Sequence, residues 1–328
     1  MQDALKKRPP HGGSRAVAQG NGGLRISQFK KSLKYNYDLY LLTIPVVIYF
    51  IVFAYWPMYG VQIAFKDYSP AFGILESPWV GLKHLKVFLD SFYFERLIRN
   101  TLAISGYSIL VGVPAPIILA LLFQEIRNTR LRSVIQAVSY APNFMSIVVV
   151  CGMILIFLNP SSGMIPAMLK QIGISVESNP MADPRLFWHI YVWSGVWQGV
   201  GWSSLVYTAS ISSIPSDQYE AATIDGAGKM RQIFTVTIPN IMPTIVIITI
   251  FSIGGLMSVG YEKVYLLQNA NNQEASEVIS TYVYKAGLTG MPRYSFASMV
   301  GLFNNLINIV ILACANFLAK KFGDTSLW

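Results

Sequence analysis

The chain has 328 residues, of which 53% are hydrophobic and only 12% are charged. A soluble globular domain usually carries about 25% charged residues, so this composition argues against a soluble protein and also against the collagen-like, disordered and disulfide-rich classes. The net charge of +9 would suit a nucleic-acid-binding protein, so the placement of the charges has to be considered before a partner is inferred.

Long apolar stretches dominate the sequence. Six of them contain no Asp, Glu, Lys or Arg and exceed the roughly 20 residues that a helix needs to cross a bilayer. These stretches are residues 39–65, 101–123, 133–158, 186–214, 240–261 and 294–319. Strands with open edges cannot lie in lipid, so we predict an all-α membrane protein with six transmembrane helices. Pro114, Pro116 and Pro142 lie within these stretches and predict kinks.

The segments between the apolar stretches indicate the orientation in the membrane. Residues 1–38 are basic, rich in glycine and without apolar periodicity, and predict a disordered leader. Lys and Arg are more frequent in this leader, in 124–132, in 215–239 and after 319 than in the other connections, which predicts that both termini are cytoplasmic. The positive charge is thus explained by membrane orientation and attraction to lipid headgroups, and we predict no nucleic-acid partner.

The connection 215–239 is polar and about one helix long. Asp217 and Glu220 have the spacing of an N-cap and capping-box pair, so we expect a short helix to begin at Asp217. Ala221 and Ala222 favour a helix with a thin surface, and Gly226 permits a turn or the close approach of another chain. From these properties alone, a solvated connector and a docking surface are equally good interpretations.

The spacing within this connection resembles a known family. Glu220, Ala221 and Ala222, followed by Gly226 and Pro239, are similar to the EAA loop of permeases in ATP-binding-cassette importers. Val236 and Ile238 stand where the family has Ile and Leu. The residues that extend the match to the form typical of carbohydrate importers are Tyr219, Ile224, Asp225 and Ala227. Residues 59–70 and 281–288 resemble a subgroup associated with complex or acidic oligosaccharides, including those from alginate.

The resemblance implies a transporter subunit rather than an enzyme. The expected fold is the six-helix bundle of type I importer permeases, in the bacterial cytoplasmic membrane. This chain would form half of a path for a carbohydrate delivered by a soluble binding protein, beside a second, different permease chain. Two ATPase subunits would bind ATP and Mg, and this chain would have no catalytic residue and no cofactor. The residues expected to couple to the ATPase are Tyr219, Glu220, Ala221, Ala222, Asp225, Gly226 and Pro239.

Polar and aromatic residues within the apolar stretches are candidates for the substrate path. Asn304, Asn305 and Asn308 are amides at mid-membrane, suited either to a sugar or to hydrogen bonds between helices. Trp193 and Trp197, one turn apart, suit stacking on a sugar, anchoring in the aromatic belt at the membrane interface, or packing between helices. Gly254 and Gly255 suggest either a bend that makes room for substrate or close helix packing.

Other interpretations remain open. The chain could serve an importer for a non-sugar solute, or it could be a channel or scaffold without ATP coupling. His11, His84 and His189 are far apart, so no metal site is predicted. Five basic residues of the segment 66–100 are either solvated loop charges or a hint of an anionic substrate, namely Lys66, Lys83, Lys86, Arg96 and Arg99.

Overall fold

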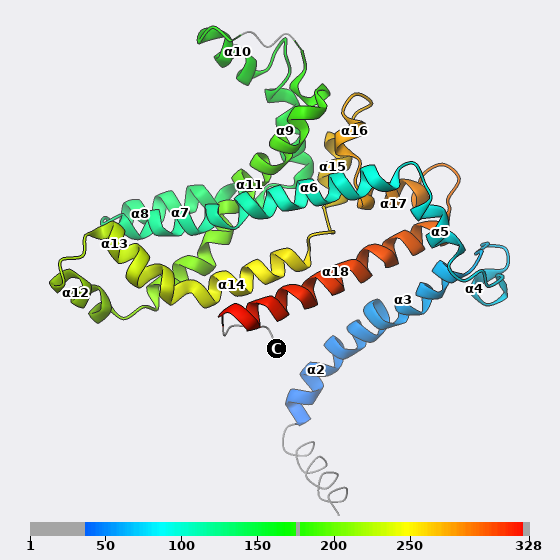
Figure 1. The fold of residues 1–328 in the computed structure, drawn as a ribbon, viewed down its shortest axis with the longest axis horizontal. Coiled ribbons are helices and arrows are strands. Elements are labelled where there is room, and N and C mark those ends of the chain that lie inside the picture. The colour runs from blue at the N-terminus through cyan, green and yellow to red at the C-terminus, as the bar shows by residue number, and fades with distance from the viewer. Residues whose placement is uncertain (1–36, 175–177, 324–328) are drawn as a thin grey trace, which may run out of the picture. The chain divides into compact units, whose positions relative to one another are not determined.

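The computed structural model describes residues 37–174 and 178–323, so nearly all of the predicted leader lies outside the described residues. The chain divides into two units, Met1–Gly60 and Val61–Trp328. Figure 1 shows that the described part is built from helices. It contains no β-strand, and its one isolated β-bridge joins Lys66 to Trp79. The predicted all-α class is confirmed.

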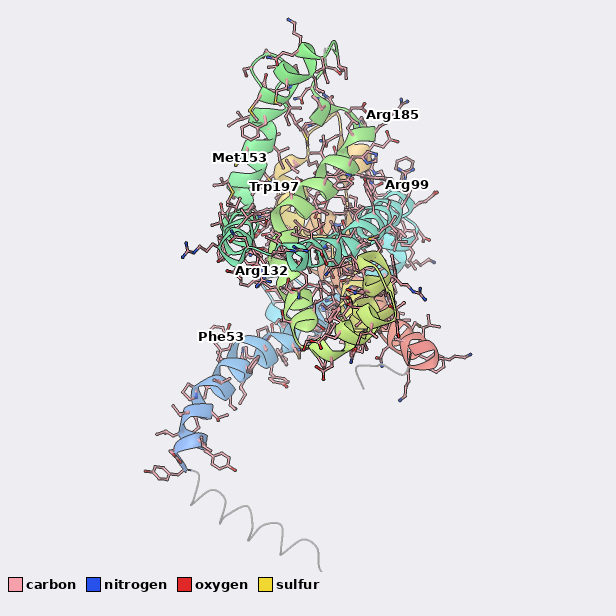
Figure 2. The ribbon with its side chains drawn as sticks, turned by 90° about the vertical axis from the view of Figure 1, so that its left-hand side faces the viewer. Phe53, Arg99, Arg132, Met153, Arg185 and Trp197 are labelled. Carbon is pink, nitrogen blue, oxygen red and sulfur yellow. The ribbon has the colours of Figure 1, made fainter. Side chains whose placement is uncertain are left out.

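The described residues of the first unit form one helical stretch, which passes from α2 (Tyr37–Phe50) through a π-helical segment (Ile51–Tyr55) into α3 (Trp56–Met58). A 3₁₀ segment, Tyr59–Phe65, continues it across the unit boundary. None of the residues in α2 is buried, and Figure 2 shows the side chain of Phe53, in the π-helical segment that follows, standing out from the ribbon. A helix that is apolar all round suits a lipid environment.

The second unit begins with short helices, α4 (Gly73–Glu76) and α5 (Lys83–Leu89). Lys66, just before them, is only 8% exposed, because its Nζ donates to the carbonyl oxygens of Ile74 and Leu75 at the end of α4. The interpretation of Lys66 as a solvated charge is therefore wrong.

Two long helices follow, α6 (Phe94–Gly112) and α7 (Pro114–Glu125). Pro114 lies at the first turn of α7, where a proline costs little because the missing N–H would have no helical partner. The next apolar stretch is broken. α8 (Thr129–Tyr140) and the 3₁₀ turn Ala141–Phe144 are bent by 97° from α9 (Ile147–Phe157), whose first turn is capped by the Ser146 hydroxyl. The predicted stretch 133–158 is thus two helices at an angle.

The rest of the unit is dominated by three long helices, α11 (Pro184–Ser212), α14 (Ile238–Gly254) and α18 (Tyr294–Gly323). α14 and α18 lie side by side (Figure 1). The shorter elements between and before them are α10 (Met164–Gln171), the 3₁₀ turn Pro180–Ala182, α12 (Ser216–Ile224), α13 (Lys229–Gln232), the π-helical segment Ile233–Thr237, α15 (Tyr261–Leu267), α16 (Gln273–Ser276) and α17 (Ile279–Leu288).

Four helical stretches in the described residues are long and apolar enough to cross a membrane, and the bent pair would make five. The four are Tyr37–Phe65, Phe94–Glu125, Lys229–Gly254 and Tyr294–Lys321. α11 covers residues 186–212 of the predicted stretch 186–214 and is long enough at 29 residues, but it falls outside this set. Its Gly, Ser and His residues make it the most polar of the six predicted stretches.

Two apolar clusters of the second unit hold α15 and the helices that flank residues 215–239. In the first, Val264 and Leu267 of α15 pack with Cys151 of α9 and Phe187 of α11. In the second, the cluster contains Ala120, Tyr207, Ile211 and Ile241. This second cluster joins α7 to α11 and α14, the helices on either side of residues 215–239. Both ends of that connection are therefore attached to a packed core.

Candidate functional site

Residues 215–239, which we call the coupling loop, begin with the short helix α12. The predicted helix exists, but the predicted cap is wrong. α12 begins at Ser216 with Pro215 at the N-cap, where no side chain accepts a capping hydrogen bond. Asp217 instead lies in the first turn, where its negative charge interacts favourably with the positive end of the helix dipole.

The end of α12 is fixed by Gly226. This residue has φ = +78°, a conformation that a side chain disfavours. The amide of Gly226 donates to the carbonyl of Thr223 at 3.0 Å, and the amide of Ala227 donates to the carbonyl of Ala222 at 2.9 Å. These two bonds form a Schellman motif, which closes the helix and turns the chain toward α13.

Side-chain hydrogen bonds attach the coupling loop to the start of α14. The hydroxyls of Tyr219 and Thr237 lie 3.0 Å apart. The amide of Gln232, which is 8% exposed, donates to Thr223 Oγ1 at 3.0 Å and to the carbonyl of Ala227 at 3.1 Å. Sequence reasoning missed Gln232, because its burial depends on how the chain folds back after Gly226. These bonds make the loop one unit with α14, so a force on α12 reaches the long helix directly.

The outer side of the coupling loop is open. Glu220, Ala221, Asp225 and Pro239 are exposed, and Glu220 forms no ion pair within the described residues. Large apolar side chains are exposed beside them, with Ile224 at 87%. A cavity of about 760 Å³, lined in part by Tyr219, Glu220 and residues at the end of α7, lies next to this surface. The loop thus presents both charge and apolar area to a partner.

The three candidate asparagines of α18 differ in their surroundings. Asn308 accepts a hydrogen bond from the amide of Met257 at 2.9 Å and donates to Ser258 Oγ at 2.8 Å, so it caps the chain where it leaves α14. Asn305 is exposed. Asn304 has a buried Oδ1 with no hydrogen-bond partner among the described residues. The two bonds of Asn308 join α18 to the segment just after α14, so they favour a structural contact over a role in binding a sugar.

Trp193 and Trp197 lie on one face of α11 and are 55% and 47% exposed (Figure 2 labels Trp197). The indole of Trp193 donates to Tyr107 Oη at 2.9 Å, and Tyr107 Oη lies 3.0 Å from His189 Nδ1. This hydrogen-bonded chain connects α6 and α11 and leaves the tryptophan ring accessible. Aromatic faces of this kind suit the C–H surface of a sugar ring.

Gly254 and Gly255 have separate roles at the end of α14. A Cβ on Gly254 would overlap Leu312 of α18 at 2.7 Å, so this glycine allows α14 and α18 to pack closely. Gly255 lies just beyond α14 and lines a cavity of about 210 Å³. The geometry therefore supports packing for Gly254 and open space for Gly255.

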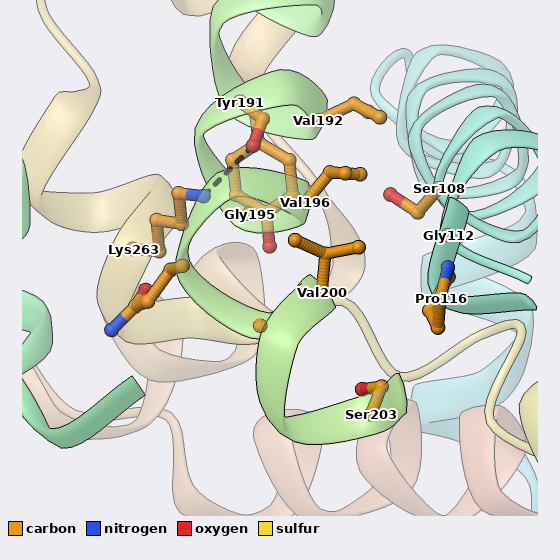
Figure 3. Close-up of a pocket in the computed structure, with 12 residues that line it drawn as sticks. Ser108, Gly112, Pro116, Tyr191, Val192, Gly195, Val196, Val200, Ser203 and Lys263 are labelled. Atoms are coloured by element: carbon orange, nitrogen blue, oxygen red, sulfur yellow. Dashed lines mark hydrogen bonds between the residues drawn. The ribbon is translucent and has the colours of Figure 1, made fainter. Parts of the chain in front are cut away.

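A third cavity, of about 350 Å³ and shown in Figure 3, lies among α6, α7, α11 and α15. Its volume is at the lower end of the 300–1,000 Å³ typical of ligand pockets. Valines of α11 form one wall, with Ser108 of α6 and Lys263 of α15 on opposite sides of them (Figure 3). It shares Ser108 and Tyr191 with the cavity beside Gly255. Sequence reasoning did not single out Lys263.

Lys263 is the one charged residue among those that line this cavity in the described chain, and it is only 7% exposed. Its Nζ donates to the carbonyl of Tyr191 at 2.8 Å and lies 4.6 Å from the centre of that residue's ring. Burial lowers the pKa of Lys263 to about 8, which leaves the amine mostly protonated at neutral pH. The titratable groups beside it are the phenol of Tyr191 and the thiol of Cys151.

The comparisons with known proteins all find membrane subunits of transport systems. The model of the family described as binding-protein-dependent transport system inner membrane component matches residues 112–323. A polygalacturonan/rhamnogalacturonan transport system permease protein of Bacillus subtilis (strain 168) is 39% identical over 291 residues, which are 88% of this chain and 90% of that protein. A chain in the crystal structure of a bacterial ABC transporter involved in the import of the acidic polysaccharide alginate matches with a TM-score of 0.83 at 38% identity, covering 90% of this chain and 99% of that chain. A second structure, of a bacterial alginate ABC transporter in complex with an alginate pentasaccharide-bound periplasmic protein, gives a TM-score of 0.83 at 37% identity, with coverages of 90% and 99%.

Proposed function

Because the chain belongs to the family of binding-protein-dependent transport system inner membrane components, we propose that it is the permease of an ATP-driven importer of acidic oligosaccharides. The chain forms half of the translocation path, and ATP is hydrolysed by a partner subunit. The observation that carries the coupling role is the geometry of α12, an exposed helix closed at Gly226 and bonded to α14 through Tyr219 and Thr237. Movement of an ATPase bound to α12 would be transmitted to the spanning helices as a rigid-body motion.

Two observations support an acidic cargo. The polysaccharides named for the relatives, polygalacturonan and alginate, are both acidic. The cavity among α6, α7, α11 and α15 carries a positive charge at Lys263, with exposed aromatic rings on the same helix as its valine wall. A positive charge, hydroxyl groups and aromatic faces together suit a chain of uronic acid residues better than a neutral, non-sugar solute.

The proposed assembly contains two permease chains of different sequence, two ATPase subunits and a soluble binding protein outside the membrane. The ATPase subunits bind ATP and Mg. Both chain termini and α12 lie on the cytoplasmic side, because Lys and Arg are enriched in the connections on that side. In this orientation α12 faces the compartment that contains ATP.

The test uses the whole complex reconstituted in liposomes with the binding protein. We expect ATP-dependent uptake of trigalacturonate and much slower uptake of the same trisaccharide with its carboxylates reduced to alcohols. Glu220→Lys should abolish uptake, because it reverses the free charge on the docking surface of α12, while the binding protein still binds its ligand. Glu95→Lys is the control, since Glu95 is an exposed carboxylate in the first turn of α6, far along the chain from the coupling loop.

Two results would contradict the proposal. Uptake that continues with a non-hydrolysable ATP analogue would identify a channel. Normal ATP-dependent uptake by the Glu220→Lys complex would remove α12 from the coupling mechanism.

A further inference from the structure

Lys263 is a buried cation without a buried anion. No carboxylate of residues 37–174 or 178–323 lies within 4 Å of its Nζ, whereas the buried carboxylate of Glu277 has both Arg96 and Lys285 as partners. The carbonyl of Tyr191 satisfies one of the three ammonium N–H groups. Removing an ammonium from water is costly unless the charge is paired, so a lysine held in this way points to an anion supplied from elsewhere.

The surroundings hold the ammonium at the cavity wall. Val264 and Leu267, on the same short helix, are fully buried in the cluster with Cys151 and Phe187, so α15 cannot swing away without opening this core. On the facing helix, a Cβ on residue 195 would lie 3.2 Å from Nζ, so the glycine there leaves space for the charged group. The lysine is therefore preorganised, which lowers the entropic cost of binding.

The other side chains of the cavity suit one sugar ring. The hydroxyls of Ser108 and Ser203 have no hydrogen-bond partner in the described part of the chain. The amide nitrogen of Gln198 donates to the carbonyl of Met145 at 3.0 Å, which leaves its carbonyl oxygen to accept from a ligand hydroxyl. The α11 valines provide an apolar wall between these polar groups (Figure 3).

We propose that Lys263 is a specificity-determining residue of the translocation path, whose ammonium binds the carboxylate of one uronic acid residue in the cavity among α6, α7, α11 and α15. This inference rests on the proposed function, because it assigns a binding site to the acidic cargo. The ring of that residue lies against the valines of α11, and its hydroxyls bond to Ser108, Gln198 and Ser203. The next residues of the oligosaccharide continue toward the exposed aromatic side chains of α11.

The test measures direct binding to the detergent-purified complex of permease and ATPase subunits without the binding protein, so that delivery does not influence the result. The probes are trigalacturonate and the same trisaccharide with its carboxylates reduced. The wild-type complex should prefer the acidic form by at least about tenfold, which corresponds to about 1.4 kcal/mol. Lys263→Met should remove this preference by weakening the acidic form alone, and Lys263→Arg should retain it.

Two further variants separate charge recognition from a structural role. Lys66→Met is the matched control, because Lys66 is another buried lysine, 8% exposed, that donates to backbone carbonyls but lies outside the cavity. It should retain the preference. Gly195→Ala keeps the lysine but crowds its ammonium, and should weaken trigalacturonate binding several-fold with the reduced sugar unchanged. If the Lys263→Met complex does not assemble, Gly195→Ala still tests whether the ammonium recognises the carboxylate.

The outcomes are distinct. Equal loss of both ligands in Lys263→Met would show that the lysine only joins α15 to α11 and would overturn the inference, as would an unchanged preference. If the wild-type complex imports the acidic form selectively while Lys263→Met keeps that selectivity, the inference fails and the proposed function stands. Equal import of both forms by the wild-type complex would contradict the proposed function itself.

Discussion

Replacing Gly226 by alanine tests whether the fixed end of α12 is needed for coupling. Gly226 has φ = +78°, and an L-residue in this left-handed region costs about 1–2 kcal/mol relative to glycine. No other atom lies within 4 Å of the position that its Cβ would occupy, so the cost comes from the backbone and not from a clash. An energy of this size changes the population of the closed loop by a factor of about 5–30.

The assay is the ATPase activity of the reconstituted complex stimulated by the loaded binding protein. We expect Gly226→Ala to lower the stimulated rate by up to that factor, and Gly226→Asn to lower it less, because asparagine tolerates the left-handed region better. Gly228→Ala is the control, since Gly228 lies in the same loop with φ = −68° and open space around its Cβ position. If Gly226→Ala and Gly228→Ala gave equal rates, the geometry of the helix end would be irrelevant to coupling.

Two other predictions follow from the described contacts. Gly201→Ala should lower the thermal stability of the purified complex by an amount typical of overpacking, about 1–3 kcal/mol, because its Cβ would overlap the carbonyl group of Ser139 on α8. Gly199→Ala, on the same helix with open space at its Cβ position, should be neutral or stabilising, and equal melting temperatures would refute the reasoning. The affinity for trigalacturonate should fall as the pH rises from 7 to 9, because Lys263 with a pKa of about 8 changes from about 90% to about 10% protonated while the substrate stays ionised. Lys263→Arg should give a flat profile over this range, since arginine stays charged, and a flat wild-type profile would contradict the assigned role.

The membrane class and the coupling loop could be predicted because both depend on local patterns. A long run of residues without charge predicts apolar helices suited to a membrane from composition alone, and the spacing from Glu220 to Pro239 is contained in one connection. Local detail was less secure. The N-cap of α12 is Pro215 and not Asp217, and the stretch 133–158 contains a 97° bend that its apolar composition conceals.

The cavity could not be predicted because it depends on contacts between distant segments. Lys263 donates to a carbonyl 72 residues earlier in the chain, and it lies in a connection that composition alone marks as an outer loop. Packing of Val264 and Leu267 against α9 and α11 turns that connection inward and buries the lysine. A lysine in sequence is almost always a solvated residue, so only the tertiary structure reveals this exception.

α11 connects the two sites. Its residues from Tyr191 to Ser203 form a wall of the cavity, and its last residue, Ser212, is followed within a few residues by α12. A helix of 29 residues is about 44 Å long and resists bending, so displacement of α12 moves the cavity wall with little loss along the way. Lys263 belongs to α15, which is packed against the other end of α11 and is not part of the coupling loop. Because Val264 and Leu267 pack with Phe187 of α11 and Lys263 Nζ donates to the carbonyl of Tyr191, a displacement of α11 carries the ammonium together with the valine wall.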